Sequence, residues 1–357
     1  MNGWELQASE LERASGETAM GACRHWPEGP GLVIGSGGST GGRKWCLQSW
    51  QNLEQSAAST GRWLTAIGID PSRVRLVNPL SPDHIGGLMP QVRSQHWEAP
   101  LLAISPSELK CPEALLQRSA ELTADSREAL ISLVPTQLQR LLENPAGIQW
   151  LQLFRLIWVG GAALSPALAQ QARKEQLQLS PCYGATETAA MVCAMDPSSF
   201  LAGAEGCGQP LGDVELRIEA KTNSIEVKTK RLSAGWLNGS TLQPFADAEG
   251  WWRSGDGGQL NADGLQVLGV QVESTFDGAI IEGAVNMNDA VFSGGDINTQ
   301  HDHRIAMAFS IAALRANAPI RILDCAHVAT SFPNFVDLAR QVGLQLDVEQ
   351  QSCGRRS

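Results

Sequence analysis

The sequence predicts an α/β protein, and three patterns lead to that prediction. Short apolar runs alternate with helix-like stretches over residues 31–202, and the first apolar run enters a loop rich in glycine and serine. Short β-like segments separated by Gly, Asp and Asn then occupy residues 203–269. Strands that alternate with helices are typical of an α/β sheet. With 357 residues, 43% of them hydrophobic, the chain can bury one large core or two moderate ones.

The α/β region opens with the apolar run from Leu32 to Ile34. Helix-like spacing from Leu47 to Ile67 predicts that a strand, a loop and a helix follow one another here. Further strands are expected at 74–77, 101–104, 129–134 and 156–159. Helices are expected among others at 136–142 and 166–176. The β region should form a small antiparallel sheet from strands at 214–218, 224–228, 251–253 and 265–268.

The pattern changes once more near residue 270. Strands are expected there at 278–282 and 320–323, and helices at 304–314 and 335–343. The predicted organisation is therefore a lead-in, an α/β core, a small antiparallel β region, a C-terminal α/β fragment and a tail, at 1–30, 31–202, 203–269, 270–346 and 347–357.

Composition excludes several classes of function. The net charge of −10 and a pI near 5.1 argue against a nucleic-acid partner, which would need clustered Lys and Arg. The start of the chain is polar and acidic, unlike a secretory signal. The most apolar long stretch, 151–164, contains Gln152 and Arg155 and falls short of the roughly 20 apolar residues of a membrane span. We therefore expect a cytoplasmic protein; its oligomeric state is not predicted.

The eight cysteines are scattered, without the close pairs that would suggest zinc or a redox centre. We expect reduced thiols. His301 and His303 form an HxH pair, but no third ligand is evident, so the sequence does not favour a metal site there.

The densest chemical signal is the glycine-rich loop from Ser36 to Lys44. Glycines let backbone N–H groups turn toward a phosphate, hydroxyls add donors and Lys44 adds a positive charge. A Walker loop would need Lys and then Ser or Thr after Gly42, which is followed by Arg and Lys instead. A dinucleotide fingerprint would need Gly or Ala at Thr40. A phosphate loop is favoured, and a flexible linker is the alternative.

This loop resembles the phosphate loop of the adenylate-forming superfamily, which includes acyl-CoA synthetases, although Arg43 stands where that family usually has proline. Further segments resemble the family's motifs in the family's order. They are Ser132–Thr136, Trp158–Leu164, Tyr183-Gly184-Ala185-Thr186-Glu187 and Gly250–Asp256, with Ser254 in place of a threonine. The resemblance covers residues 30–269 and implies the large domain of an adenylate-forming ligase, with layered sheets, flanking helices and a small β region.

The resemblance implies that ATP and Mg²⁺ are used to join a small-molecule carboxylate to CoA through an acyl-adenylate. Lys44, Thr186 and Glu187 would be catalytic, and Glu187 would also ligate Mg²⁺, which prefers oxygen ligands. Tyr183 would stack on adenine, and Asp256 would accept hydrogen bonds from the ribose hydroxyls. The implied nucleotide-binding set is Ser36, Gly37, Gly38, Ser39, Thr40, Gly41, Lys44, Gly161, Ala162, Tyr183, Gly184, Thr186 and Asp256.

Each of these residues also has a structural alternative when taken singly. Tyr183 can be a packed core aromatic, Glu187 a carboxylate favoured at a helix start, and Asp256 a turn residue in the run SGDGG. Their order relative to the loop favours the site.

The substrate follows from a narrower resemblance. The run from Asn78 to Leu88 resembles o-succinylbenzoate–CoA ligases of naphthoquinone (menaquinone or phylloquinone) synthesis, in which His84 would sit at the wall of the acyl pocket. The same fold accepts many acids. A structural role for a lone histidine is the alternative.

The resemblance to the ligases stops near residue 269. The family continues there with Arg, a variable residue and Asp, which lead into a mobile lid with a catalytic lysine, but this chain has Val270-Gln271-Val272. No lysine follows position 269. We therefore expect that the ligase lid is absent and that ligase activity is weak or lost.

Residues 266–346 resemble the C-terminal part of 3-phosphoshikimate 1-carboxyvinyltransferase (EPSP synthase). Asp302–Met307 is similar to its DHRxAM signature and Thr330–Pro333 to its TSFP segment. Arg304 would contact phosphoenolpyruvate there, and a structural ion pair with Asp302 is the alternative. A transferase fragment and an inactive nucleotide-binding fusion remnant are thus the two rivals of the ligase function.

Overall fold

The computed structural model describes most of the first 282 residues and parts of the remainder. Its described residues are 31–37, 43–105, 107–220, 222–238, 241–268, 271–274, 279–282, 295–298, 303–313, 319–323, 325, 328, 334–341 and 344–348. The chain forms two compact units, Met1–Glu282 and Gly283–Ser357. The domain boundary predicted at 269 stays a prediction.

A seven-stranded sheet forms the centre of the first unit, in the order β4-β3-β5-β6-β7-β8-β9. The strands from β4 to β7 run parallel, and β8 and β9 are antiparallel to their neighbours. Their bounds are β3 Val74–Asn78, β4 Leu101–Ala103, β5 Glu128–Leu133, β6 Leu156–Val159, β7 Leu179–Ala185, β8 Ala190–Ala194 and β9 Gln209–Pro210. The four strands expected in this region are confirmed.

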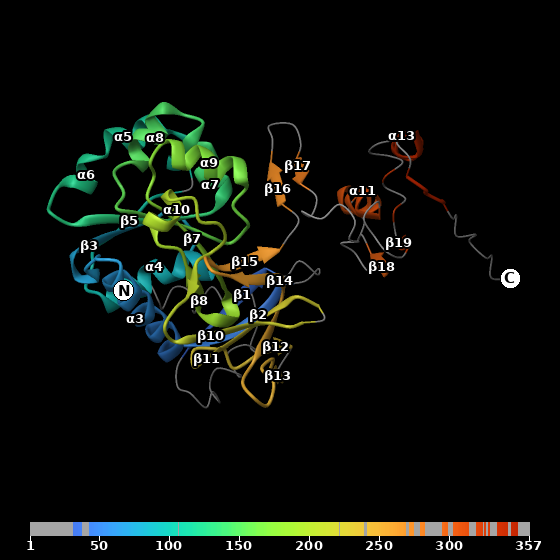
Figure 1. Cartoon of the computed structure of the whole chain (residues 1–357), viewed down its shortest axis with the longest axis horizontal. Helices are drawn as coiled ribbons and strands as arrows, with labels where there is room; N and C mark the ends of the chain where they lie inside the picture. The colour runs from blue at the N-terminus through green and yellow to red at the C-terminus, as the bar shows by residue number, and fades with distance from the viewer. Residues whose placement is uncertain are drawn as a thin grey trace. The chain divides into compact units, whose positions relative to one another are not determined.

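Helices cover both faces of this sheet, as Figure 1 shows. One face carries α5 Pro112–Gln117, α7 Pro135–Leu142, α8 Pro145–Leu151, α9 Pro166–Lys174 and α10 Pro197–Leu201, with the short α6 Ala120–Thr123 nearby in the chain. The other face packs against α3 Trp50–Ala66 and α4 Ile85–His96. α8 and α9 each begin with a proline in the first turn. Asn144 caps the start of α8 and Ser165 caps the start of α9, as the residue preferences at helix starts predict.

The glycine-rich loop connects two paired strands. β1 Gly31–Gly37 pairs antiparallel with β2 Arg43–Ser49, and Ser36 lies opposite Lys44. The helix expected between Leu47 and Ile67 is confirmed as α3 Trp50–Ala66, but its expected start is too early, because the strand β2 extends to Ser49. Residues 46 to 49 are all buried, so the strand lacks the alternation that would have identified it. β12 Trp236–Asn238 and β13 Thr241–Gln243 complete this sheet.

A second antiparallel sheet packs on the antiparallel end of the central sheet. It has the order β10-β11-β14-β15, with bounds Val214–Ile218, Ser224–Thr229, Trp252–Asn261 and Gly264–Leu268. A buried cluster that includes Val192, Cys193, Ile225 and Trp252 joins the two sheets. β14 is much longer than the expected strand at 251–253. The turn interpretation of Asp256 is therefore wrong, because this residue lies within β14.

The remaining described elements are short. β16 Gln271–Ser274 and β17 Ala279–Glu282 form a hairpin at the end of the first unit. In the second unit, β18 Gly295–Asn298 pairs parallel with β19 Ile320–Leu323, and the helices are α11 His303–Ala312 and α13 Phe335–Gln341. The strands and helices expected after residue 270 are thus confirmed within one or two residues of their bounds.

Candidate functional site

Tyr183 and Asp256, 73 positions apart in the chain, meet side chain to side chain. The Tyr183 hydroxyl donates a hydrogen bond of 2.8 Å to Asp256 Oδ2. Tyr183 is half-buried on β7, and Asp256 is exposed on β14. Burial, followed by the charge of Asp256, raises the pKa of Tyr183 far above its ordinary value, so its hydroxyl remains a donor. The contact between the two sheets thus joins two residues of the predicted nucleotide site.

Thr186 and Glu187 lie in a tight turn that follows β7 directly, the 3₁₀ helix η3 Thr186–Thr188. Both residues are buried, with 8% and 7% of their surface exposed. Gln48 Nε2 donates to the Thr186 carbonyl at 2.6 Å, and Trp236 Nε1 donates to Glu187 Oε1 at 2.9 Å. The turn is therefore connected to β2, the strand on which Lys44 lies, and to β12.

The glycine-rich loop is described only at its two ends. Ser36 and Gly37 end β1, Lys44 lies in β2, and the side chains of Ser36 and Lys44 are outside the described part. Gly38, Ser39, Thr40 and Gly41 lie outside the described residues. Because Gln48 of β2 contacts η3, the backbone of Lys44 lies on a strand that is bonded to the Thr186–Thr188 turn. The phosphate-binding role of the loop stays a prediction.

Gly161, Ala162 and Gly184 line the exposed carboxyl ends of β6 and β7. All three are exposed, and Gly161 has a φ of +82°, which disfavours a side chain. A side chain at Gly184 would collide with the backbone of Ala190 and Met191, so the close approach of β7 and β8 requires glycine there. Ligands of open α/β sheets bind at the carboxyl ends of the strands, which is consistent with the predicted adenine position.

His84 is exposed and precedes α4, where its side chain makes no capping hydrogen bond. The same helix carries Arg93, which is only 4% exposed and lies 4.8 Å from the Trp158 ring and 6.0 Å from the Trp97 ring. Burial lowers the pKa of Arg93 to about 10, so it stays charged at neutral pH. Its Nη2 donates to Thr60, whereas its Nε and the neighbouring Trp158 Nε1 have no partner among the described residues. Sequence reasoning missed this buried cation.

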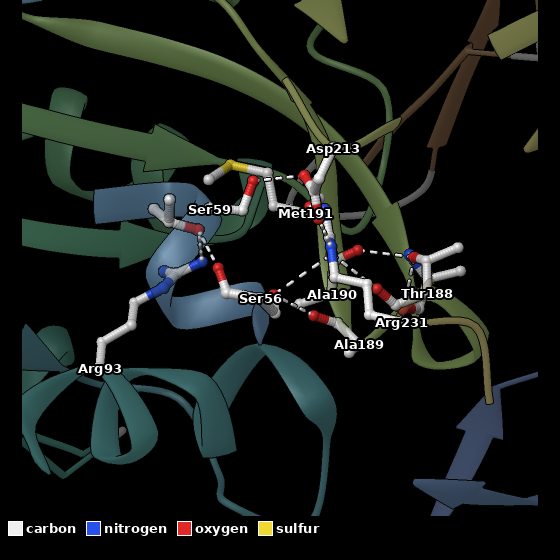
Figure 2. A network of polar contacts seen from close by, with 11 residues as sticks. Ser56, Ser59, Arg93, Thr188, Ala189, Ala190, Met191, Asp213 and Arg231 are labelled. Carbon is white, nitrogen blue, oxygen red and sulfur yellow. Dashed lines mark hydrogen bonds and ion pairs between the residues drawn. The ribbon is translucent and has the colours of Figure 1, made fainter. Parts of the chain in front are cut away.

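Arg231 is the second buried cation that the sequence did not reveal. It is 0% exposed and binds Asp213 at 2.8 Å, and Asp213 in turn accepts from Ser59. Figure 2 shows how this network joins α3 to the segment after Glu187. Burial is the largest single influence on the pKa of Asp213 and raises it, but the charge of Arg231 and the hydrogen bonds that Asp213 accepts lower it by more when taken together, so this pKa lies below its ordinary value. Nothing in the run Lys230-Arg231-Leu232 marks which cation is buried.

The described part of the chain shows neither a disulfide nor a cluster of metal-ligating side chains. Cys46, Cys111, Cys182, Cys193, Cys207 and Cys325 are free thiols there. Burial raises the pKa of Cys182 to about 12 and of Cys207 to about 11, so these thiols are inert at neutral pH. No group of three or more His, Cys, Asp or Glu side chains gathers among the described residues, and none of their helices has the length and apolar character needed to cross a bilayer.

The C-terminal part of the chain has clear sequence relatives. The family model for EPSP synthase (3-phosphoshikimate 1-carboxyvinyltransferase) matches residues 259–338. The chain is 41% identical over 160 residues to this transferase from Methylococcus capsulatus, which covers 42% of the chain and 35% of the relative. With the Acidithiobacillus ferrooxidans transferase it is 53% identical over 87 residues, or 24% of the chain and 19% of the relative. The side chain of Arg304 and residues 329–333 lie outside the described part.

Solved structures resemble the first unit. An o-succinylbenzoate–CoA synthetase from Bacillus subtilis in complex with AMP has a TM-score of 0.54 and 24% identity, over 66% of this chain and 48% of that one. The same B. subtilis enzyme with ATP and magnesium has a TM-score of 0.54 and 25% identity, over 66% and 49%. E. coli MenE with a bound OSB-AMS analogue has a TM-score of 0.53 and 24% identity, over 69% and 51%. This chain thus spans about half the length of these structures.

The family model for AMP-binding enzymes matches residues 3–230. This match covers more than half of the 357 residues, and it includes the glycine-rich loop and the Tyr183–Glu187 motif. The chain has the adenylate-forming ligase fold in its first unit and belongs to the AMP-binding enzyme family.

Proposed function

We propose that the first unit binds ATP with Mg²⁺, activates a carboxylate as an acyl-adenylate and passes the acyl group to CoA. Lys44 and the loop would hold the β- and γ-phosphates, and Thr186 would reach the α-phosphate. Negative charge builds on phosphate during adenylation, so positioned donors and cations account for most of the catalysis.

The observation that carries this proposal is the convergence of motifs that are far apart in the chain. The hydrogen bond between Tyr183 and Asp256 joins β7 to β14, and the bond from Gln48 to Thr186 joins β2 to η3. These bonds link β7 to β14 and β2 to η3, the elements that carry the predicted adenine, ribose and α-phosphate contacts and one end of the glycine-rich loop. Burial of apolar side chains alone would not account for these polar contacts between distant motifs.

Mg²⁺ fits the residues at this turn. It is usually held by one or two carboxylates together with substrate phosphates and waters. Glu187 provides one buried carboxylate, and the described residues contain no larger cluster of ligands. Mg²⁺ would supply charge neutralisation to the triphosphate. Glu187 would hold the ion, Thr186 would donate to the phosphate, and the buried walls would limit access of water.

We propose o-succinylbenzoate as the acid, because its second carboxylate matches a buried cation. Arg93 is buried beside Trp158 and has no carboxylate partner among the described residues. A buried, unpaired guanidinium is costly unless a ligand pairs with it. His84, which directly precedes the helix that carries Arg93, would lie at the pocket wall. Menaquinone or phylloquinone synthesis would be the corresponding pathway.

The direct test is pyrophosphate release from ATP and Mg²⁺ with a panel of aromatic mono- and dicarboxylic acids. We expect release with dicarboxylates and none with monocarboxylates. Arg93→Met should remove the preference for dicarboxylates. Release that is independent of any acid, or equal for all acids, would contradict the proposed substrate.

Nucleotide binding is tested separately from turnover. Lys44→Ala and Asp256→Ala should each weaken ATP binding, whereas the exposed matched controls Lys174→Ala and Asp263→Ala should not. Unchanged ATP affinity in both site variants would refute the site. ATP binding without acid-dependent pyrophosphate release would instead favour the inactive remnant.

The match to EPSP synthase supports one alternative function, a carboxyvinyl transferase. The matched segment is residues 259–338, and the chain covers at most about a third of the transferases compared above. If this alternative holds, shikimate 3-phosphate and phosphoenolpyruvate should raise the melting temperature of the full chain. No shift with either compound would reject it.

A further inference from the structure

The turn that carries Thr186 and Glu187 is held at every carbonyl from Ala185 to Met191. Gln48 donates to the Thr186 carbonyl, the Ser233 amide donates to the Glu187 carbonyl at 2.8 Å, and Ser56 donates to the Ala189 carbonyl at 2.5 Å. The Thr188 hydroxyl lies 2.7 Å from the Ala190 carbonyl and 3.0 Å from the Ala185 carbonyl and shares its one proton between them. Arg231 donates to the Thr188 and Met191 carbonyls. Because every one of these carbonyls accepts a hydrogen bond, the conformation of the turn is fixed.

Three of these contacts come from one short segment, residues 231–236. Arg231 Nη1 donates to the Thr188 carbonyl at 2.7 Å, and its Nη2 donates to the Met191 carbonyl at 2.8 Å (Figure 2). Because Arg231 is fully buried, these bonds are not exchanged for water. They hold a turn in which Ala189 and Ala190 adopt the left-handed conformation, with φ of +51° and +74°. The backbone on both sides of Glu187 is thereby fixed.

The same segment also reaches the Glu187 carboxylate. Trp236 Nε1 donates to Glu187 Oε1 at 2.9 Å. Among the described residues, the other oxygen, Oε2, receives no hydrogen bond. An indole N–H donates and cannot accept or lose its proton, so it orients a carboxylate without neutralising it. Trp236 is itself packed against Phe245, with ring centroids 4.8 Å apart.

We propose that Trp236 is a positioning residue: its indole holds Oε1 of Glu187 so that Oε2 faces the magnesium-bound phosphates. The proposal rests on the proposed function of Glu187, and it adds a residue that no motif of the sequence indicates. Partners that hydrogen-bond to a metal ligand typically change metal affinity about 10- to 100-fold when they are removed. Removal of the indole N–H should therefore weaken the magnesium-dependent part of nucleotide binding and leave the remainder intact.

The experiment compares Trp236→Phe with Trp252→Phe in the full chain. Trp252 is buried in the same aromatic group, 5.8 Å from Phe245, but its Nε1 has no hydrogen-bond partner among the described residues. Both variants lose one indole N–H, and only the first loses a bond to Glu187. The affinity for a non-hydrolysable ATP analogue is measured with Mg²⁺ and with EDTA. We expect Trp236→Phe to lose about tenfold with Mg²⁺ and nothing with EDTA, and Trp252→Phe to match the unmodified protein in both.

Glu187→Gln separates the two ideas that are under test. If Glu187→Gln loses the magnesium-dependent gain and Trp236→Phe keeps it, the positioning role is refuted while the proposed function stands. If the unmodified protein gains nothing from Mg²⁺, the proposed function fails and the positioning role fails with it. If Trp236→Phe weakens binding equally with Mg²⁺ and with EDTA, its role is structural only, and the proposal is overturned.

Discussion

The two parts of this chain differ in how similar they are to their relatives in sequence and in how much of those relatives they cover. The first unit is only 24 to 25% identical to the solved ligases compared above, yet the resemblance covers about two thirds of this chain and about half of each of theirs. The C-terminal part is 41 to 53% identical to the transferases compared above but covers only 19 to 35% of their length. Higher identity therefore accompanies a smaller share of the relative's length, so the degree of identity alone does not indicate how much of a relative is present in this chain.

Burial of apolar side chains shows the same contrast. In the first unit, Trp150, Leu53 and Leu64 are essentially unexposed and belong to continuous clusters. Large exposed hydrophobic residues in the described part are Leu260, Ile311, Leu338 and Val348, and all but the first lie in the second unit. Apolar side chains that face water are expected where a segment lacks the surface that covers it in its relatives. The contrast predicts that mutations in the two units differ greatly in their effects.

The largest effect is expected in the core of the first unit. Trp150 is 1% exposed and packs edge-on against Phe154 at 4.8 Å. Trp150→Ala should lower the free energy of unfolding by about 3–5 kcal/mol, because the removed ring leaves a cavity. Urea titration measures this change. The half-buried Trp251 gives a matched control, Trp251→Ala, and equal losses for both variants would contradict the placement of the core.

A somewhat smaller effect is expected from the buried ion pair. Arg231→Met should cost about 3 kcal/mol, since it leaves Asp213 and two backbone carbonyls without their donor. The control is Arg217→Met, in which the lost arginine is 45% exposed and its pair with Glu226 contributes within about 1 kcal/mol. Thermal unfolding compares the two. If both variants have the same melting temperature as the unmodified protein, the Arg231 network does not stabilise the unit.

The pH dependence should reflect the same pair more weakly, because the Asp213 side chain is 25% exposed. The pKa of Asp213 lies below its ordinary value, so its contribution is fully present above that value, at about pH 4, and is lost as the pH falls through the lowered pKa. The free energy of unfolding should therefore decline less steeply below about pH 4 in Asp213→Asn than in the unmodified protein. Parallel curves from acid titrations followed by circular dichroism would show that Asp213 is not the responsible group.

The smallest effect is expected in the second unit. Leu338 is 46% exposed on α13, so Leu338→Gln should change the free energy of unfolding by no more than about 0.5 kcal/mol. It should also reduce binding of a hydrophobic dye, because an exposed apolar group is removed. A loss comparable to that of Trp150→Ala would mean that this face is covered, and the contrast between the units would fail.

Local patterns predicted the parallel strands well and the strands near the site poorly. The expected strand at 156–159 matches β6 Leu156–Val159 residue for residue, because a short, fully buried apolar run is flanked by turn signals. β7 contains Pro181, Tyr183 and Gly184, which have little apolar periodicity, and it was not expected from the pattern. Its formation depends on pairing with β6 and β8, and such pairing is a tertiary effect.

In the candidate site, the sequence pointed only to residues that belong to a motif. The run from Tyr183 to Glu187 indicated Thr186 and Glu187, but no pattern indicated Gln48, which bonds to Thr186 from 138 positions away. Arg231 and Trp236 are 43 and 49 positions from their partners. A side chain that acts through another residue depends on the fold, so single-sequence reasoning identifies it only by chance.

The left-handed pair Ala189 and Ala190 gives the turn beside Glu187 an intrinsic tendency to open. Each alanine in that conformation costs about 1 kcal/mol relative to the right-handed form. Glycine would remove that cost, but the Ala189 methyl group fills a fully buried place in the cluster around Leu53 and Leu88. The backbone amides of this turn should thus exchange with solvent through local openings whose rate is set by how firmly Ser56 and Arg231 hold it.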